Sequence, residues 1–148
     1  MGRRVAQAAG FTLLELIVTL FVLALAVGLS APAIGRSAQA IRARAEVAGF
    51  AAVFRRARAE AVTTQRAHAV VVDPAARRVT VVAGADEVRQ TRTLSPDMTV
   101  VASPPPALSV RFEPQGVSSG GEFHVSSGTI RYRVTIDPLT GRVRNERE

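Results

Sequence analysis

The first part of the sequence is apolar enough to form a membrane-spanning helix. No charged residue occurs from Leu16 to Gly35. A helix of about twenty residues extends about 30 Å, which matches the hydrocarbon thickness of a bilayer. The pattern therefore predicts a transmembrane helix over residues 11–34.

The following segment keeps a helical period but becomes amphipathic. Apolar residues recur at spacings of three and four and so share one helix face; they are Val47, Phe50, Phe54, Ala57 and Ala61. The pairs Arg42–Glu46 and Arg56–Glu60 lie four residues apart on the flanks, in the weaker basic-first order. We predict one helix from Phe11 to about Thr64, with residues 35–64 as its amphipathic continuation.

Residues 65–148 show the pattern of short strands separated by Gly, Pro and Ser. The segments AHAVVVD and RRVTVVA flank Asp73-Pro74-Ala75-Ala76, a spacing that predicts a hairpin. Further strands are predicted in EVRQTRTL, MTVVA, LSVRF, EFHVS and TIRYRVTID. The predicted fold class is α+β, with the long N-terminal helix packed on a small antiparallel sheet or sandwich. So small a sheet needs the apolar helix face to complete its core.

Composition and charge limit the chemistry. The formal net charge is +7, all nineteen basic residues are Arg, and there is no Cys. The absence of Cys excludes a disulfide framework and a sulfur-based metal site. The positive charge is compatible with nucleic acid or anionic lipid as a partner.

The sequence contains one match to a catalytic motif, but the predicted elements around it do not fit that motif. Gly116-Val117-Ser118-Ser119-Gly120 matches G-x-S-x-G, but a nucleophile elbow requires a following helix, and here the strand EFHVS follows. His68 and His124 are the only two histidines, and both fall on predicted strands. We therefore predict no enzyme activity, no metal site and no cofactor.

Basic residues precede the apolar block. Arg3 and Arg4 favour a cytoplasmic N-terminus, which places the rest of the chain across the membrane. An ordinary secretory signal would be cut behind the apolar region at a small-residue site. Ala24-Leu25-Ala26 and Ser30-Ala31-Pro32-Ala33 are candidates for such a site. On that alternative the helix is discarded.

Glu15 places a carboxylate at the head of the apolar block. A charged group inside a membrane is costly and is usually paired and functional. In the first turn of a helix it also meets the positive end of the helix dipole. One interpretation is that Glu15 caps its own helix and reaches the membrane interface. The other is that it neutralises a cation on a neighbouring subunit.

The segment Gly10-Phe11-Thr12-Leu13-Leu14-Glu15 resembles the processing site of type IV prepilins and type II secretion pseudopilins. In those proteins a membrane peptidase cleaves after the glycine and methylates the new N-terminal amine. The resemblance implies a leader of residues 1–10, cleavage between Gly10 and Phe11, and N-methylation of Phe11. Glu15 would then form an assembly salt link with the Phe11 amine of the next subunit.

The later segments FRRARAEAVTTQRAHAVVV, FEPQGVSSGGEF and DPLTGRVR are similar to those of the H-type minor pseudopilin of type II secretion and of related minor type IV pilins. The resemblance implies a pilin-like fold and a structural role near the tip of a pseudopilus that helps export folded proteins across the outer membrane.

The same resemblance implies partners and a location. The partners are the prepilin peptidase, major and minor pseudopilins, the inner-membrane secretion platform and membrane lipid. The chain would cross the bacterial inner membrane once, with residues 65–148 in the periplasm, before entering a periplasmic pseudopilus.

Two alternatives remain at this point. One is a minor type IV pilin acting in pilus assembly or DNA uptake; GRVR, residues 141–144, resembles a segment implicated in DNA binding by related pilins. Arg142 and Arg144 are therefore candidate anion contacts. The other is an unprocessed single-pass membrane protein, if Gly10 is not cut.

Strand pairing argues against a DNA role for the C-terminal arginines. A hairpin closed by Asp137 and Arg142 sets Arg133 opposite Glu146 and Arg131 opposite Glu148, so that the protein neutralises these cations itself. DNA binding needs several uncompensated phosphate contacts. DNA is therefore not an expected partner.

Overall fold

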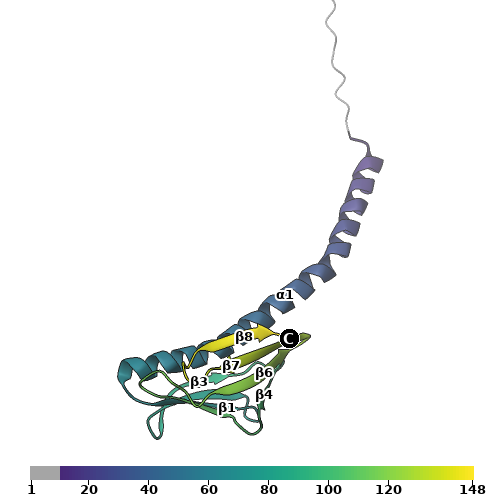
Figure 1. Cartoon of the computed structure of the whole chain (residues 1–148). Coiled ribbons are helices and arrows are strands. Elements are labelled where there is room, and N and C mark those ends of the chain that lie inside the picture. Colours follow the sequence, from purple (N-terminus) through teal and green to yellow (C-terminus); the bar gives the residue numbers. More distant parts are fainter. Residues whose placement is uncertain (1–10) are drawn as a thin grey trace, which may run out of the picture. The chain divides into compact units, whose positions relative to one another are not determined.

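The described part of the chain folds into one helix and eight strands, arranged as in Figure 1. The computed structural model describes residues 11–148, except for the side chains of residues 29–37. Helix α1 covers Leu13–Thr64 and contains 52 residues. The strands are β1 (His68–Asp73), β2 (Arg78–Ala83), β3 (Glu87–Thr93), β4 (Met98–Ser103), β5 (Ser109–Phe112), β6 (Gly121–Ser127), β7 (Ile130–Ile136) and β8 (Val143–Arg147). The chain divides into two compact units, residues 1–39 and 40–148, and α1 contributes to both.

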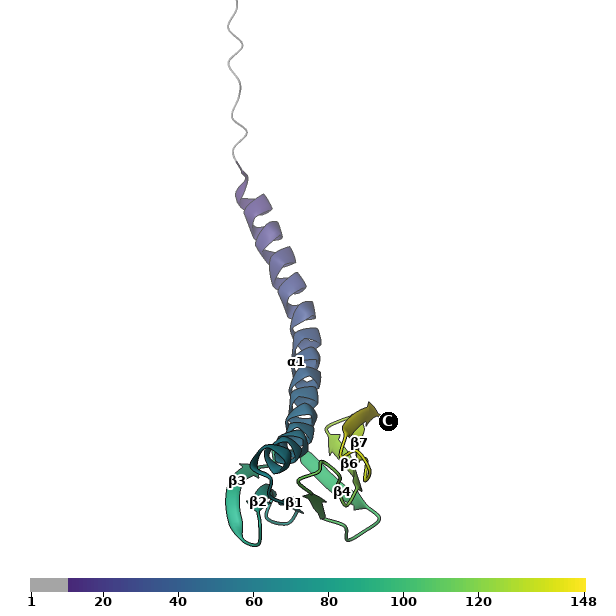
Figure 2. The same cartoon turned by 60° about the vertical axis from the view of Figure 1, so that its left-hand side comes forward.

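In the second unit the strands form two antiparallel sheets of four strands each (Figure 2). Their orders are β3-β2-β1-β5 and β4-β6-β7-β8. The hairpin predicted around residues 73–76 is the β1–β2 pair, in which Asp73 lies opposite Arg78. The predicted α+β fold is therefore confirmed, and its strands form two sheets.

The C-terminal hairpin has the register expected from the sequence. Arg133 lies opposite Glu146, and Ile136 lies opposite Val143. The Asp137 amide donates to the Arg142 carbonyl (3.0 Å), and the Glu148 amide donates to the Arg131 carbonyl (3.1 Å). Strand β8 lies along the second half of α1 in Figure 1.

The core of the second unit lies between α1 and the inner faces of both sheets. The helix face predicted from the 3-4 spacing is buried at all five positions, with exposed fractions of 0–1%. Phe50 and Phe54 contact Phe123 of β6, with ring centroids 5.8 and 5.3 Å apart. The Phe50–Phe123 pair is edge-on and the Phe54–Phe123 pair is tilted, and aromatic pairs of this kind add to the free energy of apolar burial. The amphipathic half of α1 is thus a structural part of this unit.

The flanking ion pairs of the helix differ from one another. Arg56 and Glu60 form the expected pair, with 2.8 Å between Nε and Oε1. Within the described residues Arg42 forms no such pair with Glu46. Instead, Glu46 accepts a hydrogen bond from the Ser127 hydroxyl of β6 (3.2 Å). Because β6 packs on α1, the Glu46 carboxylate bonds to Ser127 and not to Arg42 on its own helix.

In the first unit, α1 presents apolar side chains to its surroundings. Phe11, Leu13 and Leu14 are 81%, 75% and 71% exposed. Along the described part of the chain, no helix is both long and apolar enough to span a membrane. The predicted span of residues 11–34 ends among side chains that lie outside the described part.

Candidate functional site

The start of α1 is built by a cap that the sequence analysis did not identify. The Thr12 hydroxyl accepts a hydrogen bond from the Glu15 amide (3.2 Å), and the Thr12 carbonyl accepts the Leu16 amide (3.1 Å). Thr12 is thus the N-cap, and Glu15 is the third helical residue. A threonine followed three residues later by glutamate is the capping-box pattern. That spacing was a readable signal in TLLE.

The Glu15 carboxylate itself is not consumed by this cap. Among the described residues, its oxygens make no hydrogen bond and no ion pair, while its amide is held by Thr12. The carbonyl of Glu15 accepts from the Thr19 hydroxyl (2.9 Å). The carboxylate therefore sits on a fixed first turn, near the positive end of the helix dipole, and is available to an external cation.

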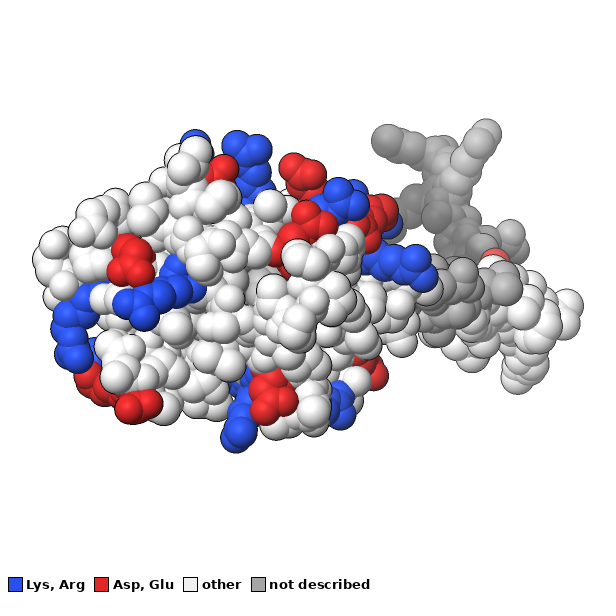
Figure 3. All heavy atoms as spheres, turned by 60° about the horizontal axis from the view of Figure 1, so that its bottom comes forward, with Lys and Arg blue, Asp and Glu red and all other residues white. Residues whose placement is uncertain are grey.

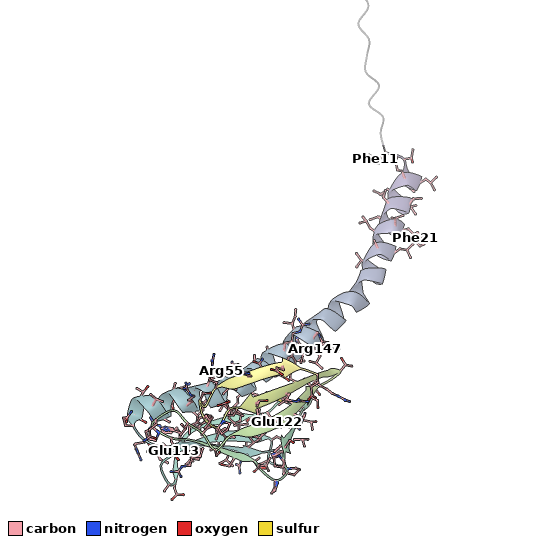
Figure 4. All side chains as sticks on the ribbon, in the orientation of Figure 1. Phe11, Phe21, Arg55, Glu113, Glu122 and Arg147 are labelled. Carbon is pink, nitrogen blue, oxygen red and sulfur yellow. The ribbon has the colours of Figure 1, made fainter. Side chains whose placement is uncertain are left out.

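Around this carboxylate the helix surface is apolar. In Figure 4 the labelled Phe21 side chain projects from the helix and Phe11 lies just before the helix start; Phe21 is 64% exposed. The exposed large apolar residues of this stretch include Leu16, Ile17, Val18, Leu20, Leu23 and Leu25. A continuous apolar surface of this size marks a site for a protein or membrane partner.

Of the predicted processing residues, the structure describes Phe11 and Glu15. Gly10 lies outside the described residues. Phe11 is the first described residue and precedes the cap Thr12, so the helix begins two residues later, at Leu13. Phe11 and Glu15 are brought together only through sequence proximity at this helix start.

Arg142 and Arg144 lie on or beside the last hairpin. Both are exposed, and neither side chain forms a hydrogen bond or a salt bridge within the described range. Asp137, nearby, has its pKa lowered mainly by hydrogen bonds from the Thr140 amide and hydroxyl, with a smaller contribution from Arg144. On the face shown in Figure 3, basic and acidic groups alternate, with no broad basic field.

Arg133, whose charge was predicted to be neutralised within the protein, lies in a cluster of charged side chains at β6–β8. Arg133 Nη2 lies 2.9 Å from Glu148 Oε1, and His124 lies 3.0 Å from Glu148 and 3.2 Å from Glu122. The hydrogen bond from Arg133 is the main cause of the lowered pKa of Glu148. Arg133 thus pairs with Glu148 and Glu122, and not with Glu146 opposite it in the register.

The remaining candidate residues make contacts within the fold. The described residues contain no group of His, Asp and Glu side chains arranged to hold a metal ion. Ser118, in the G-x-S-x-G segment, donates from its hydroxyl to the Asp137 carbonyl (2.9 Å), and strand β6 follows the segment. His68 is 2% exposed, and its Nδ1 lies 2.9 Å from the Arg66 carbonyl.

Two segments of this chain match known protein families. Residues 46–140 match the family described as type II transport protein GspH, and residues 6–31 match the prokaryotic N-terminal methylation motif. The chain is 30% identical over 146 residues to type II secretion system protein H of Xanthomonas campestris pv. campestris. That alignment covers 94% of this chain and 83% of the relative.

Solved structures show the same fold. The type IV minor pilin FimU of Pseudomonas aeruginosa is 15% identical, with a TM-score of 0.62, covering 73% of this chain and 90% of FimU. The minor pseudopilin EpsH from the type 2 secretion system of Vibrio cholerae is 18% identical. It has a TM-score of 0.57 and covers 71% of this chain and 96% of EpsH. At such identities the likeness concerns the fold.

Proposed function

Because this chain belongs to the GspH family of type II transport proteins and has the minor-pseudopilin fold, we propose that it joins a type II secretion pseudopilus near the tip. Its role there is structural and requires no catalytic group. The observation that carries the proposal is the start of α1. An exposed apolar helix begins with a capped turn that holds one unpaired carboxylate, Glu15.

Processing would complete this site. Cleavage between Gly10 and Phe11 by a prepilin peptidase removes residues 1–10 and creates an amine at Phe11. An α-amino group titrates at a pKa of about 7.7–8.0 and is therefore largely cationic at neutral pH. The match to the N-terminal methylation motif supports both the cleavage and the methylation of Phe11.

The Glu15 carboxylate then receives the Phe11 amine of a neighbouring subunit. Apolar surroundings strengthen such a charge pair, since water screens it less. The exposed apolar residues on the same helix pack against neighbouring helices in the fibre, or against lipid before assembly. The neighbours are major and minor pseudopilins, supported by the inner-membrane secretion platform.

The location follows from the same features. Arg3 and Arg4 precede the apolar segment, which favours a cytoplasmic N-terminus and a periplasmic C-terminal domain. We place the subunit in the inner membrane as a single-pass protein before assembly, with residues 11–34 as the span. The sheets then face outward from a periplasmic pseudopilus.

The intact mass and N-terminal residue of the membrane-isolated protein test this proposal. We expect a chain that starts at methylated Phe11, and Gly10→Leu should leave full-length precursor in the membrane. Gly2→Leu, a matched change elsewhere in the leader, should be processed normally. A chain starting near Ala31, or normal processing of Gly10→Leu, would contradict the peptidase assignment.

A minor type IV pilin is the competing role. The fold likeness to FimU is shared with EpsH and does not separate the two, whereas the GspH family match favours secretion. Deleting the gene should therefore abolish export of folded proteins across the outer membrane and leave pilus-dependent motility and DNA uptake intact. The opposite pair of phenotypes would assign the chain to a pilus.

A further inference from the structure

Two adjoining hollows lie along the connection from β3 to β4. The first, about 340 Å³, is lined by Glu46 and Phe50 of α1, Arg92 of β3, and Leu94, Pro96 and Met98. The second, about 270 Å³, shares the last three residues and adds Pro74, Arg77 and Val100 among others. We call the two together the β3–β4 groove. Its shared floor is apolar, since Leu94 and Met98 are buried core residues.

Arg92 is seated on the helix by a glycine. A Cβ atom at Gly49 would overlap the two terminal nitrogens of Arg92 and lie 2.7 Å from its Cζ. Glycine is unfavourable inside a helix relative to alanine. The absence of a side chain at position 49 is what allows the guanidinium to lie against the helix and beside the first hollow.

The positive charges of the groove are not neutralised by the protein. Within the described residues, the side chains of Arg92 and Arg77 make no hydrogen bond or ion pair. Arg92 is half-buried, so its guanidinium is partly removed from water and has no acidic side chain bonded to it in the described part of the chain. Glu46 lines the same hollow but accepts its hydrogen bond from Ser127. Asp97 is exposed on the β3–β4 connection and pairs with neither arginine.

The edges of the sheets add a second recognition element. Strand β4 pairs with β6 alone, so its other edge has no strand partner among the described elements. The second hollow follows that strand along Met98, Thr99 and Val100. An unpaired edge offers main-chain donors and acceptors to an extended peptide, and adjacent pockets select its side chains.

From this arrangement we propose that the β3–β4 groove binds an extended segment of another protein, in which acidic residues flank an apolar pair. The carboxylates meet Arg92 and Arg77, and the apolar residues cover Leu94 and Met98. The proposal concerns the second unit and is independent of cleavage at Gly10.

The test uses the full-length chain in neutral detergent micelles and a fluorescent, acetylated and amidated peptide, Ser-Glu-Leu-Val-Glu-Ser. Fluorescence anisotropy should show saturable binding. The matched peptide with both Glu replaced by Gln should bind at least about fivefold more weakly, because the charge pairs are lost. Equal binding of the two peptides would overturn the proposal.

Variants locate the binding to the groove. Arg92→Gln should weaken the acidic peptide about fivefold or more, whereas Arg89→Gln, on the same strand but paired with Glu87, should bind like the unaltered protein. Gly49→Ala should weaken binding by displacing Arg92 while thermal stability is maintained, which separates the site from folding. Equal losses in Arg89→Gln and Arg92→Gln would mean diffuse charge attraction. If the protein binds phosphatidylglycerol vesicles in an Arg92-dependent way and does not bind the peptide, the ligand of the groove is a lipid and the proposal of a protein partner is wrong.

Discussion

Arg58 of α1 donates from Nε to the carbonyl oxygen of Thr140 at 3.0 Å, which joins two residues 82 positions apart in the chain. The same nitrogen lies 3.2 Å from the carbonyl of Gly116. One helical cation thus holds the β5–β6 loop and the β7–β8 turn together. These loops close the end of the domain at which α1 terminates.

Removing this cation should loosen both loops. Arg58→Ala leaves two carbonyls without their charged donor, and we expect the free energy of unfolding to fall by about 1.5–3 kcal/mol. Urea unfolding of the two proteins measures the difference. Arg56→Ala is the control, because it removes an exposed i,i+4 pair with Glu60 and should cost about 0.3–0.5 kcal/mol. Equal effects would mean that the Arg58 contacts contribute little.

Gly141 is required by both its backbone angle and its surroundings. Its φ is +62°, and a Cβ atom there would overlap the Gly116 carbonyl oxygen and lie 2.8 Å from Arg58 Nε. Gly128 has a similar φ of +58° but open space around it. Gly128→Ala should cost about 1 kcal/mol from backbone strain, and Gly141→Ala should cost clearly more. Melting curves of the two variants measure the loss of thermal stability. Equal losses would show that the overlap of a Cβ atom at position 141 with its neighbours contributes nothing.

The Phe50–Phe54–Phe123 cluster should dominate the stability of the second unit. Phe54 is fully buried and contacts both other rings. Phe54→Ala should lower the free energy of unfolding by about 3–5 kcal/mol through lost burial and the cavity left behind. Phe21→Ala, at a 64% exposed position, should leave the denaturant midpoint of the sheets unchanged. A small effect at Phe54 would contradict a shared helix–sheet core.

Glu15→Ala should separate processing from assembly. The cap hydrogen bond uses the backbone amide of Glu15, so the variant keeps its helix start, and we expect normal cleavage after Gly10. Without the carboxylate the neighbouring amine is left uncompensated, and incorporation into the pseudopilus and protein export should be strongly reduced. Sheared-fibre immunoblots and secretion assays measure this.

Glu15→Asp is the matched control, since it retains the charge on a shorter side chain. Partial activity is expected from it, above that of Glu15→Ala. Wild-type assembly of Glu15→Ala would show that the carboxylate does not bind the amine.

The Asp137 turn should make stability depend on acid pH. Its lowered pKa arises first from the Thr140 amide, then from the Thr140 hydroxyl. A depressed folded-state pKa stabilises the fold above the unfolded value, near 4, and that contribution is lost as pH falls through the folded value. Asp137→Asn should thus have a lower free energy of unfolding than the parent chain at neutral pH, and the difference should narrow as the pH falls below about 4.

Urea midpoints measured across this range check the effect. Asp97→Asn, a change at an exposed position elsewhere, is the control. Its urea midpoint should not show the pH-dependent difference from the parent chain that is expected for Asp137→Asn. If the stability difference between Asp137→Asn and the parent chain does not change with pH, ionisation of Asp137 does not stabilise this turn.

Periodic segments were predictable because each local pattern has one favourable arrangement. The 3-4 spacing from Val47 to Ala61 defined the buried face before any partner was known, because those positions coincide on a helix. The alternation in residues 130–136 likewise determined which side chains of β7 face the core. The capping pattern of Thr12 and Glu15 is equally local, because the two residues lie three positions apart and meet in the first turn of the helix.

Side-chain partners were harder to predict when several candidates were within reach. Arg133 and Glu146 were matched by register, yet Arg133 pairs with Glu148 and Glu122, because long side chains select among neighbours by geometry. Glu46 was matched to Arg42 by helical spacing but bonds to Ser127, which only the folding of β6 onto α1 brings near.

The sequence by itself determined the N-terminal methylation motif, the apolar helix with Glu15 at its head, the amphipathic stripe and the strand order along the chain. These depend on local period, charge and a short processing motif. The tertiary structure alone decided how the strands divide into two sheets, which loops Arg58 ties together, and that Gly49 seats Arg92 beside an apolar groove. Such features join residues far apart in sequence, and chain spacing carries no record of which distant surfaces will meet.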